Sequence, residues 1–394
     1  FDRFWKWPDY NSERVYLKGT ADVTDKLQVS GVVYYDWHKD TVYDYTTTDM
    51  GRLRASGSGS YDDYASGGRM EAAYAFNDSN RLAVYGAYRQ ISHKGYDMNG
   101  NTYVETLGDH YKEAYWDFGA EYAWKPVKPL TIMFGGTYTW VESKLNEYKD
   151  TSVKTLDREE MGRNIWNGQV GAFYEFIDHH ELFATFATKS RMPTLRERYT
   201  TTDLPNPNLD PEHALHYELG YRGVYEDWLK VTTSVYYSDI SDMIAQVGNR
   251  TARNRRFVNI DEVQTYGWEF TTEAIVNEYV TGGLTYSWMQ WNTVDNPAKL
   301  QNLPESMATV YAVVTPVKGL SITPQVNYMD TFYDDSSGHS QSSFLTADFK
   351  LGYEITDSFS VEAGARNIFD KNYEYSYCYP EPGRNFFAGI NAKF

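Results

Sequence analysis

The chain has 394 residues, a formal net charge of -17 and a mean hydropathy of -0.62. No apolar run approaches the ~20 residues that a membrane-spanning helix needs, which excludes a helical membrane protein but not a β-barrel, in which only alternate residues face lipid. The acidic charge argues against a nucleic-acid partner, because phosphate binding needs a basic surface. The single cysteine, Cys378, excludes an internal disulfide and a cysteine zinc site.

Strands of alternating polarity are predicted along the whole chain. Every second side chain is apolar in four clear stretches, 229–237, 320–328, 359–366 and 386–394. A strand with one face toward lipid and the other toward a polar interior needs this period of two. Aromatic residues make up 17% of the chain, which suits girdles at the membrane surface, although a soluble carbohydrate-binding β-protein would share that composition.

The predicted connections alternate between short and long. The short ones fall at about 22–26, 77–80, 125–129, 177–180, 225–227, 276–278, 316–318 and 356–357. The long ones fall at about 40–66, 96–110, 144–163, 192–210, 241–255, 292–302, 331–341 and 371–383. A soluble sandwich would also alternate in polarity but would lack this rhythm, which is typical of short periplasmic turns and long extracellular loops. We therefore expect an all-β fold, a transmembrane antiparallel β-barrel in the bacterial outer membrane.

About 17 strands are predicted, with no linker that would divide residues 1–394 into two domains. Bacterial single-chain barrels use even strand numbers because both chain ends lie in the periplasm. If the last strand ends there, the first predicted strand, 12–21, also runs toward the periplasm. Residues 1–10 would then lie in an extracellular loop, and further strands are expected from outside this sequence.

An ordered series of residues lies near the C-terminus. It comprises Asn367, Phe369 and Asp370, then Gly383 and Arg384, and the terminal Phe394. This series resembles the closing signature of TonB-dependent receptors, in which an Asn-Leu-Phe-Asp-like turn precedes a Pro-Gly-Arg step and a terminal aromatic residue. An ordinary loop between strands would explain the glycine and the prolines but not the whole order.

A second series lies in the middle of the chain. It comprises Arg191 and Pro193, then Asn206, Pro207, Asn208, Leu209, Pro211 and Glu212. It is similar to the Arg-Ala-Pro-Thr and Asn-Pro-Asn-Leu-x-Pro-Glu blocks of the same family, with Met192 in place of the usual alanine. The prolines are expected to stiffen a long loop and to mark re-entry into a strand.

A third and weaker similarity covers 5–10, 16–19 and 34–36, which resemble mid-barrel sequence in the branch that includes cobalamin and iron-chelate receptors. The resemblance implies a 22-stranded barrel that encloses a plug, of which this chain would hold strands 6 to 22. It also implies import of a scarce metal chelate driven by the TonB-ExbB-ExbD complex, which grips a Ton box at the family's N-terminus. The plug, the Ton box and the first strands are expected from a preceding part of the protein or from a second chain.

The predicted loop 40–66 combines aromatic and acidic residues that suit ligand capture. Its tyrosines, Tyr43, Tyr45, Tyr61 and Tyr64, could contact a flat organic chelate. Its carboxylates, Asp40, Asp44, Asp49, Asp62 and Asp63, could hold structural calcium, because calcium prefers hard oxygen ligands. The spacing is not that of a defined calcium loop, so a solvated acidic loop is the alternative.

Four arginines form a positive cluster in this acidic chain: Arg250, Arg253, Arg255 and Arg256. They could attract an anionic ferric chelate, or equally the phosphates of lipopolysaccharide at the lipid surface. Both alternatives stay open.

The chain shows no catalytic motif such as Gly-x-Ser-x-Gly or His-Glu-x-x-His. We therefore expect a transporter without a cofactor rather than an enzyme, with an iron-siderophore or cobalamin-like ligand. A passive porin and a surface-binding barrel or adhesin are the competing hypotheses, because each would share the strand pattern.

Overall fold

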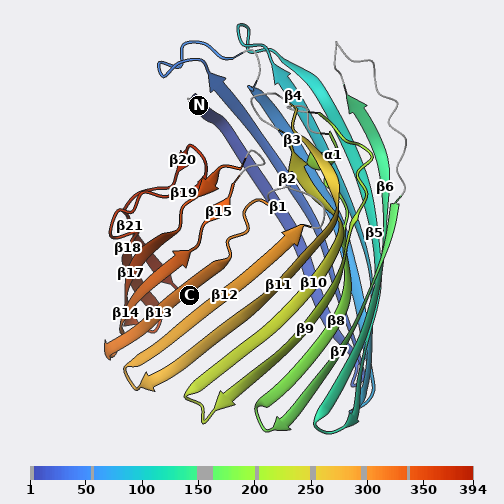
Figure 1. Cartoon of the computed structure of the whole chain (residues 1–394), viewed down its shortest axis with the longest axis vertical. Helices are drawn as coiled ribbons and strands as arrows, with labels where there is room; N and C mark the ends of the chain where they lie inside the picture. Colours follow the sequence, from blue (N-terminus) through green and yellow to red (C-terminus); the bar gives the residue numbers. More distant parts are fainter. Residues whose placement is uncertain are drawn as a thin grey trace. The chain divides into compact units, whose positions relative to one another are not determined.

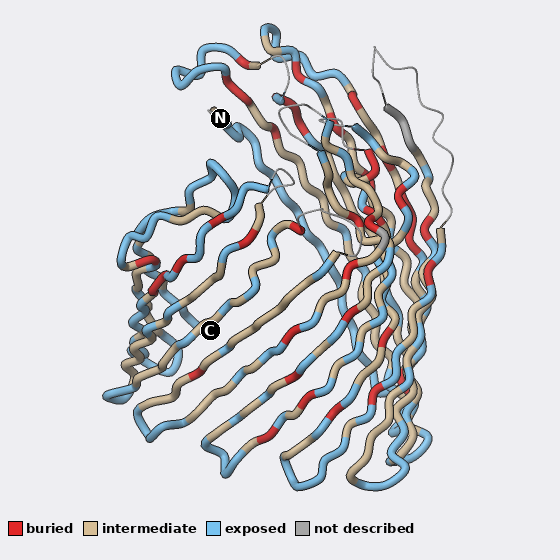
Figure 2. Tube along the Cα trace, viewed as in Figure 1, coloured by how far each residue is buried: buried red, intermediate tan, exposed pale blue. Residues whose placement is uncertain are grey.

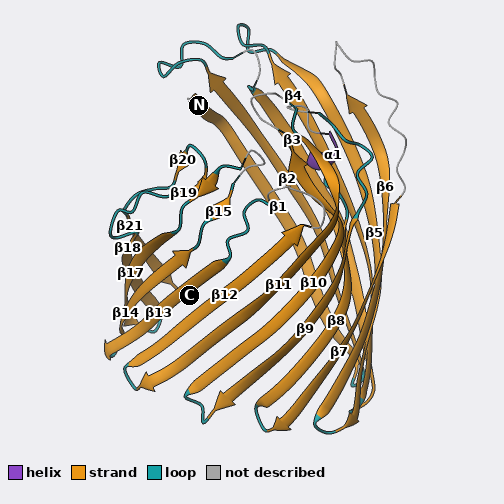
Figure 3. Cartoon of the chain, in the orientation of Figure 1, coloured by secondary structure: helices purple, strands orange, loops and turns teal. Residues whose placement is uncertain are grey.

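The computed structural model describes residues 4–54, 57–148, 163–199, 204–248, 254–293, 300–334 and 338–393. Nearly all of this part is β-strand, and its helix α1 (Leu195–Tyr199) is a single short turn (Figure 3). None of the helical residues described there forms a segment long and apolar enough to cross a membrane.

The chain divides into two compact units, Phe1–Pro126 with Ile132–Gln169, and Val127–Thr131 with Val170–Phe394. The first contains β1 (Phe4–Thr24), β2 (Leu27–Tyr45), β3 (Gly59–Asn77), β4 (Asn80–Met98) and most of β5 (Glu105–Val127) and β6 (Leu130–Tyr148). The division runs through β7 (Arg163–Ile177). The second contains β8 (His180–Arg191), β9 (Glu212–Tyr225), β10 (Leu229–Val247), β11 (Arg256–Asn277), β12 (Val280–Thr293), β13 (Ser306–Val317), β14 (Leu320–Met329), β17 (Phe344–Thr356), β18 (Phe359–Arg366) and β21 (Asn385–Ala392). Two small hairpins, β15 (Phe332–Tyr333) with β16 (Ser340–Gln341) and β19 (Glu374–Ser376) with β20 (Tyr379–Pro380), lie in its connections.

Within each unit the strands form an antiparallel meander, in which each long strand pairs with its predecessor (Figure 1). The described strands include one 17-stranded sheet, which confirms the predicted fold class and strand number. All eight predicted short turns are confirmed, because a turn of two or three residues separates the strands at each position. Within each unit, the short turns lie at one end of the strands and the described long connections at the other (Figure 1).

The strands extend well beyond their predicted ends. The prediction of a loop over residues 1–10 is wrong for residues 4–10, since β1 begins at Phe4, and residues 1–3 lie outside the described residues. The predicted loop 40–66 is shorter than expected, because β2 continues to Tyr45 and β3 starts at Gly59. The physical reason is that ~10 residues suffice to cross lipid. Beyond that length both faces of a hairpin meet water, so the strand continues without alternation in polarity.

In each unit, the long strands have one apolar and one polar face. An apolar row of paired residues crosses the first unit through Leu17, Val33, Gly68, Tyr88 and Trp116. The adjacent row on the opposite face is Lys18, Val32, Arg69, Ala87 and Asp117. The second unit repeats this, with the row Leu219, Val235, Trp268 and Trp288 beside the row Gly220, Ser234, Glu269 and Ser287. Side chains alternate across a strand, so the sequence pattern produces the two faces directly.

The apolar faces are not covered by protein. Large side chains such as Leu17, Met70 and Leu219 are more than half exposed, and only scattered positions along the strands are buried (Figure 2). The described residues bury only two small hydrophobic clusters, one around Leu53 and one around Ile260. Exposed apolar surface on this scale needs an apolar surrounding medium.

Candidate functional site

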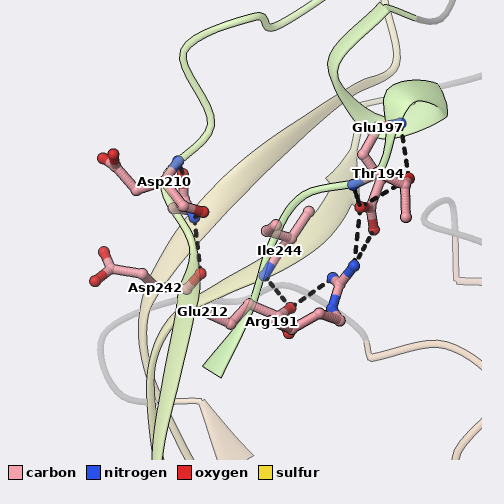
Figure 4. Close-up of polar contacts among 8 residues, drawn as sticks. Arg191, Thr194, Glu197, Asp210, Glu212, Asp242 and Ile244 are labelled. Atoms are coloured by element: carbon pink, nitrogen blue, oxygen red, sulfur yellow. Dashed lines mark hydrogen bonds and ion pairs between the residues drawn. The ribbon is translucent and has the colours of Figure 1, made fainter. Parts of the chain in front are cut away.

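The loop that follows β8 is fastened to the sheet of the second unit by Arg191 (Figure 4). Its Nε and Nη2 atoms donate to the two carboxylate oxygens of Glu212, at 2.7 and 2.8 Å. Its Nη1 donates to both oxygens of Glu197, at 3.0 and 2.9 Å. One guanidinium therefore joins the end of β8, the start of β9 and helix α1, a use for which its planar fork is well shaped.

Helix α1 begins with a capping box. The Thr194 hydroxyl accepts the backbone N–H of Glu197 at 3.3 Å, and the Glu197 carboxylate accepts the backbone N–H of Thr194 at 2.7 Å. Burial alone would raise the pKa of Glu197, but hydrogen bonds from Arg191 and Thr194 outweigh it and lower that pKa. The carboxylate thus stays ionised where it holds both the helix and the arginine.

The same loop is tied to the next two strands. Glu212 Oε1 accepts the backbone N–H of Ile244 in β10 at 2.7 Å. Asn259 in β11 accepts from the Asp210 N–H at 2.9 Å and donates to the carbonyls of Asp210 and Asp242 at 2.9 and 2.7 Å. The chain bends at Asp242, which has a φ of 56°. Arg191, Glu212 and their neighbours therefore form a fastening for the loop rather than an open ligand site.

The rest of the central series also holds the loop in place. Asn206 Nδ2 donates to the Phe257 carbonyl at 2.8 Å. Leu209 is completely buried, and Pro193 is buried as well. Pro207 and Asn208 form the turn between Asn206 and Leu209, and Pro211 directly precedes the first residue of β9.

The C-terminal series builds a closed turn. Asn367 is 3% exposed at a φ of 49°. Its amide side chain donates to the Lys371 carbonyl at 2.8 Å and accepts the Lys371 N–H at 2.9 Å. Asp370 Oδ1 accepts the Arg384 N–H at 2.8 Å. A side chain at Gly383 would collide with that Asp370 oxygen, which explains the glycine. Phe369 is 75% exposed, and Phe394 lies outside the described residues.

A different kind of site lies on the polar face of the first unit, near the ends with long connections. Two adjacent rows of paired residues cross β1 to β5 there. The tyrosine row consists of Tyr10, Asp40, Tyr61, Gly95 and Asp109. The histidine row consists of Ser12, His38, Asp63, His93 and Tyr111. Paired residues of antiparallel strands point to one side, so these side chains form one surface, called here the aromatic-acidic wall.

His93 is at the centre of this wall. Its ring stacks between Tyr61 and Tyr111, with centroids 5.9 and 6.1 Å away and interplanar angles of 25° and 7°. Its Nδ1 lies 2.6 Å from Asp63 Oδ1, and its Nε2 lies 3.8 Å from Asp109 Oδ2. A side chain at Gly95 would collide with the Asp109 carboxylate, so the glycine leaves space for this carboxylate beside the imidazole.

The wall is strongly acidic. Burial lowers the pKa of His93, but the hydrogen bond and charge of Asp63, with the charge of Asp109, outweigh it and raise that pKa. Burial and the nearby charge of Asp97 raise the pKa of Asp109. Burial also raises the pKa of the Tyr61 hydroxyl, and four carboxylates add to that shift: Asp109, Asp40, Asp97 and Asp63. Negative charge therefore converges at the Tyr61 and His93 rings.

Only one of the four predicted ligand-contact tyrosines belongs to this wall. Tyr61 faces it, whereas Tyr64 lies on the opposite face of β3 and stacks against Tyr35 at 6.2 Å. Tyr43 and Tyr45 contact each other edge to face and pack in the cluster around Leu53. As ligand contacts all four stay predictions.

The five predicted calcium ligands are spread over different surroundings. Asp40 and Asp63 belong to the wall, and Asp62 accepts a hydrogen bond from Trp37 on the other face at 2.9 Å. Asp44 is paired with Arg54 at 3.3 Å, and Asp49 accepts a hydrogen bond from Thr47. Within the described ranges no three His, Cys, Asp or Glu side chains come together as a metal site. Structural calcium stays a prediction without a formed site.

Of the predicted arginine cluster, Arg250 and Arg253 lie outside the described residues. Arg255 is half-buried, and its carbonyl accepts the Leu204 N–H at 2.9 Å. Arg256 is exposed at the start of β11, where it pairs with Val247. Their predicted role toward anions is untested.

Sequence reasoning missed His38, His93, Asp109 and Tyr111. The available signal was the hairpin register, because residues equally far from a short turn pair with each other. Counting from the turn at 78–79 brings Asp63 opposite Lys94, and the register shift between Ala75 and Asn77 moves Asp63 opposite His93.

Comparison with known proteins identifies the family to which this fold belongs. Residues 1–368 match the family model described as "TonB dependent receptor-like, beta-barrel". The chain belongs to this family of receptors. Its members are outer-membrane β-barrels, so the apolar faces meet lipid, and the polar faces, including the aromatic-acidic wall, line the lumen. Short turns face the periplasm in such barrels, which places the wall toward the extracellular ends.

Curated relatives within the family include two proteins named vitamin B12 transporter BtuB, one from Photobacterium profundum and one from Vibrio vulnificus. Each is 26% identical over 256 residues, which is 62% of this chain and 40% of the relative. The chain therefore matches less than half the length of these relatives.

Solved structures share the fold. The copper transporter OprC superposes with a TM-score of 0.83 at 15% identity, over 98% of this chain and 66% of that one. The siderophore receptor PiuA from Acinetobacter baumannii gives 0.79 at 14% identity, over 100% and 65%.

Proposed function

We propose that the protein imports a scarce metal chelate, an iron-siderophore or a cobalamin-like compound, by TonB-dependent transport across the outer membrane. The observation that carries this proposal is the family match over residues 1–368. The relatives named as vitamin B12 transporters and the structural likeness to a siderophore receptor support this ligand class.

In this proposal the barrel captures and positions the ligand, and segments outside this chain supply the gate. The luminal wall around His93 provides ring faces and charges that a chelate could contact. A plug and a Ton box, which couples to TonB-ExbB-ExbD, would belong to the preceding part of the protein or to a second chain. Lipid, and lipopolysaccharide at the outer leaflet, would surround the apolar faces.

Growth of a deletion strain tests the proposal. The full-length gene is removed, and growth is measured on iron-limited medium with single siderophores and on cobalamin-dependent medium. We expect a defect on one ligand that the intact gene restores only when the energy-transducing protein is present. No defect on any ligand, or restoration without that protein, would count against import by this route and favour an adhesin or a passive porin.

A further inference from the structure

Three lysines of the first unit lie on its lipid-facing side, toward the ends with long connections. They are Lys39 in β2, Lys94 in β4 and Lys112 in β5, and they are called here the lysine patch. An even number of residues separates each lysine from the apolar row that crosses its strand, so all three side chains lie on the apolar face. The proposed import assigns no role to them.

Strand pairing brings the three lysines together. Lys39 and Lys94 both pair with Asp62 of β3, so they lie about 10 Å apart, twice the strand spacing. Lys112 pairs with Ser92, two residues before Lys94, and is a diagonal neighbour of Lys94 at about 7–8 Å. The patch thus spans the adjacent strands β2 to β5 (Figure 1).

The ammonium groups of the patch have no ion pair or hydrogen bond with another described residue. Two carboxylates lie in the same rows of paired residues. Asp62 accepts a hydrogen bond from Trp37 at 2.9 Å, and Glu13 is exposed on β1. Three lysines against two carboxylates leave the patch with an excess of positive charge in a chain whose net charge is -17.

Aromatic side chains lie next to the patch on the same face, on the side of the short turns. Trp37 and Tyr35 precede Lys39 by two and four residues, and Trp116 follows Lys112 by four. Trp and Tyr rings concentrate at the boundary between acyl chains and headgroups, and lysine reaches from there toward the polar side with its long stem. The ammonium groups therefore lie at the depth of the lipid headgroups, where phosphates are concentrated.

Strands β10 and β11 of the second unit differ beyond their aromatic residues. On their apolar face, Tyr237 pairs with Tyr266. The next two pairs toward the long connections contain Asp239 and Glu262 and no lysine. Positive charge beyond the aromatic residues is therefore not general to the lipid-facing strands of this chain, as expected of a binding site.

From this arrangement we propose that the lysine patch binds the phosphate groups of a glycolipid in the outer leaflet, with chemistry like that of the phosphorylated disaccharide of lipopolysaccharide. Lysine binds phosphate as a point charge. The acyl chains of that lipid pack against the aromatic and apolar side chains on the same face. The proposal concerns the lipid partner of the barrel and holds whatever ligand the barrel imports.

The test compares two lipids that differ in phosphate alone. One is a hexa-acylated lipid A with two phosphates, and the other is the same acylated disaccharide without phosphate. Each is titrated onto the full-length receptor in a neutral detergent at low ionic strength, where charges are weakly screened. The bound fraction is measured by native mass spectrometry.

A lysine near an anionic lipid surface contributes about fivefold in affinity. Three lysines, offset in part by the two carboxylates, should make the phosphorylated lipid bind about tenfold more tightly. This preference should fall below about twofold in the triple variant Lys39→Gln, Lys94→Gln and Lys112→Gln. The triple replacement of the same lysines by arginine should retain it, because the charges stay in place.

The matched control removes three exposed lysines elsewhere in the first unit, in the triple variant Lys18→Gln, Lys26→Gln and Lys125→Gln. Lys18 lies on the polar face of β1, and Lys26 and Lys125 lie beside short turns. The net charge falls equally while the patch stays intact, so the control should keep the preference. Adding about 1 mM inorganic phosphate, too dilute to screen charges, should not displace the lipid.

Equal binding of the two lipids, a preference that survives in the glutamine variant of the patch, or loss of the preference in the arginine variant would overturn the proposal. So would an equal loss in the control variant, which would indicate net charge alone. Displacement of the lipid by inorganic phosphate would contradict a glycolipid as the partner.

Discussion

Replacement of Arg191 by methionine should release the loop between β8 and β9. Methionine keeps the aliphatic packing but removes the four hydrogen bonds to Glu197 and Glu212. These carboxylate side chains are only 15% and 17% exposed, so losing the cation leaves two partly buried charges without it. Charged hydrogen bonds contribute about 1.5–3 kcal/mol each when buried. Because the arginine is 42% exposed, solvent screening reduces the total, and we expect a loss of about 2 kcal/mol in local stability.

Hydrogen exchange measures this loss at two defined amides. The Thr194 N–H donates to Glu197 and the Ile244 N–H donates to Glu212. Both amides should therefore lose protection from exchange when Arg191 no longer holds these two carboxylates. About 2 kcal/mol corresponds to exchange roughly 30-fold faster. Arg196→Met, on the exposed side of α1, removes the same charge and is the control. Unchanged exchange at both amides in the Arg191 variant would refute the fastening role.

Three further predictions follow from local geometry. The lowered pKa of Glu197 contributes stability that is present above the ordinary value of 4.5 and is lost as the pH falls through the lowered pKa. The protection factor of the Thr194 amide, which is the intrinsic exchange rate divided by the observed rate at the same pH, should therefore fall below pH 4.5 but not change between about pH 6 and 8. Asp63→Asn should lower the pKa of His93, which is measured by deuterium exchange at the imidazole C2–H. The control, Asp117→Asn, should leave the pKa of His93 unchanged. An equal fall in both variants would mean that the net negative charge of the surface, and not Asp63, raises the pKa of His93. Asn367→Ala should destabilise the turn between Asn367 and Lys371 by about 1–3 kcal/mol, because it removes both side-chain hydrogen bonds to Lys371. The fraction of the protein that stays folded after heating, measured by its migration on gels, should therefore fall. The exposed Asn372→Ala is the control. An equal folded fraction in the two variants would contradict a stabilising role for Asn367.

The strands and their short turns could be predicted because alternation is a local property. In 229–237 each side chain already carries the polarity of its face, and lipid requires that polarity. The prediction failed outside the lipid, at residues 4–10 and at the ends of β2 and β3. There water meets both faces, and backbone pairing continues without a pattern in side-chain polarity.

The candidate site could be predicted only in part, because it depends on register. Tyr61 and Tyr64 have the same chemistry, yet an odd spacing of three residues places them on opposite faces of β3. Asp109 was assigned to a loop, although β5 carries it opposite Gly95. Arg191 was identified from its series, but its connection to the Ile244 amide through Glu212 requires the pairing of β9 with β10.

Energised uptake tests the proposed import most directly. Cells that express the full-length protein are given radiolabelled cyanocobalamin or siderophores loaded with radioactive iron, and accumulation is compared with and without the energy-transducing protein. We predict accumulation of one chelate that disappears when that protein is removed, together with the absence of large steady conductance from the purified protein in planar bilayers. Equal accumulation in both strains, or a large open-channel conductance, would contradict TonB-dependent import.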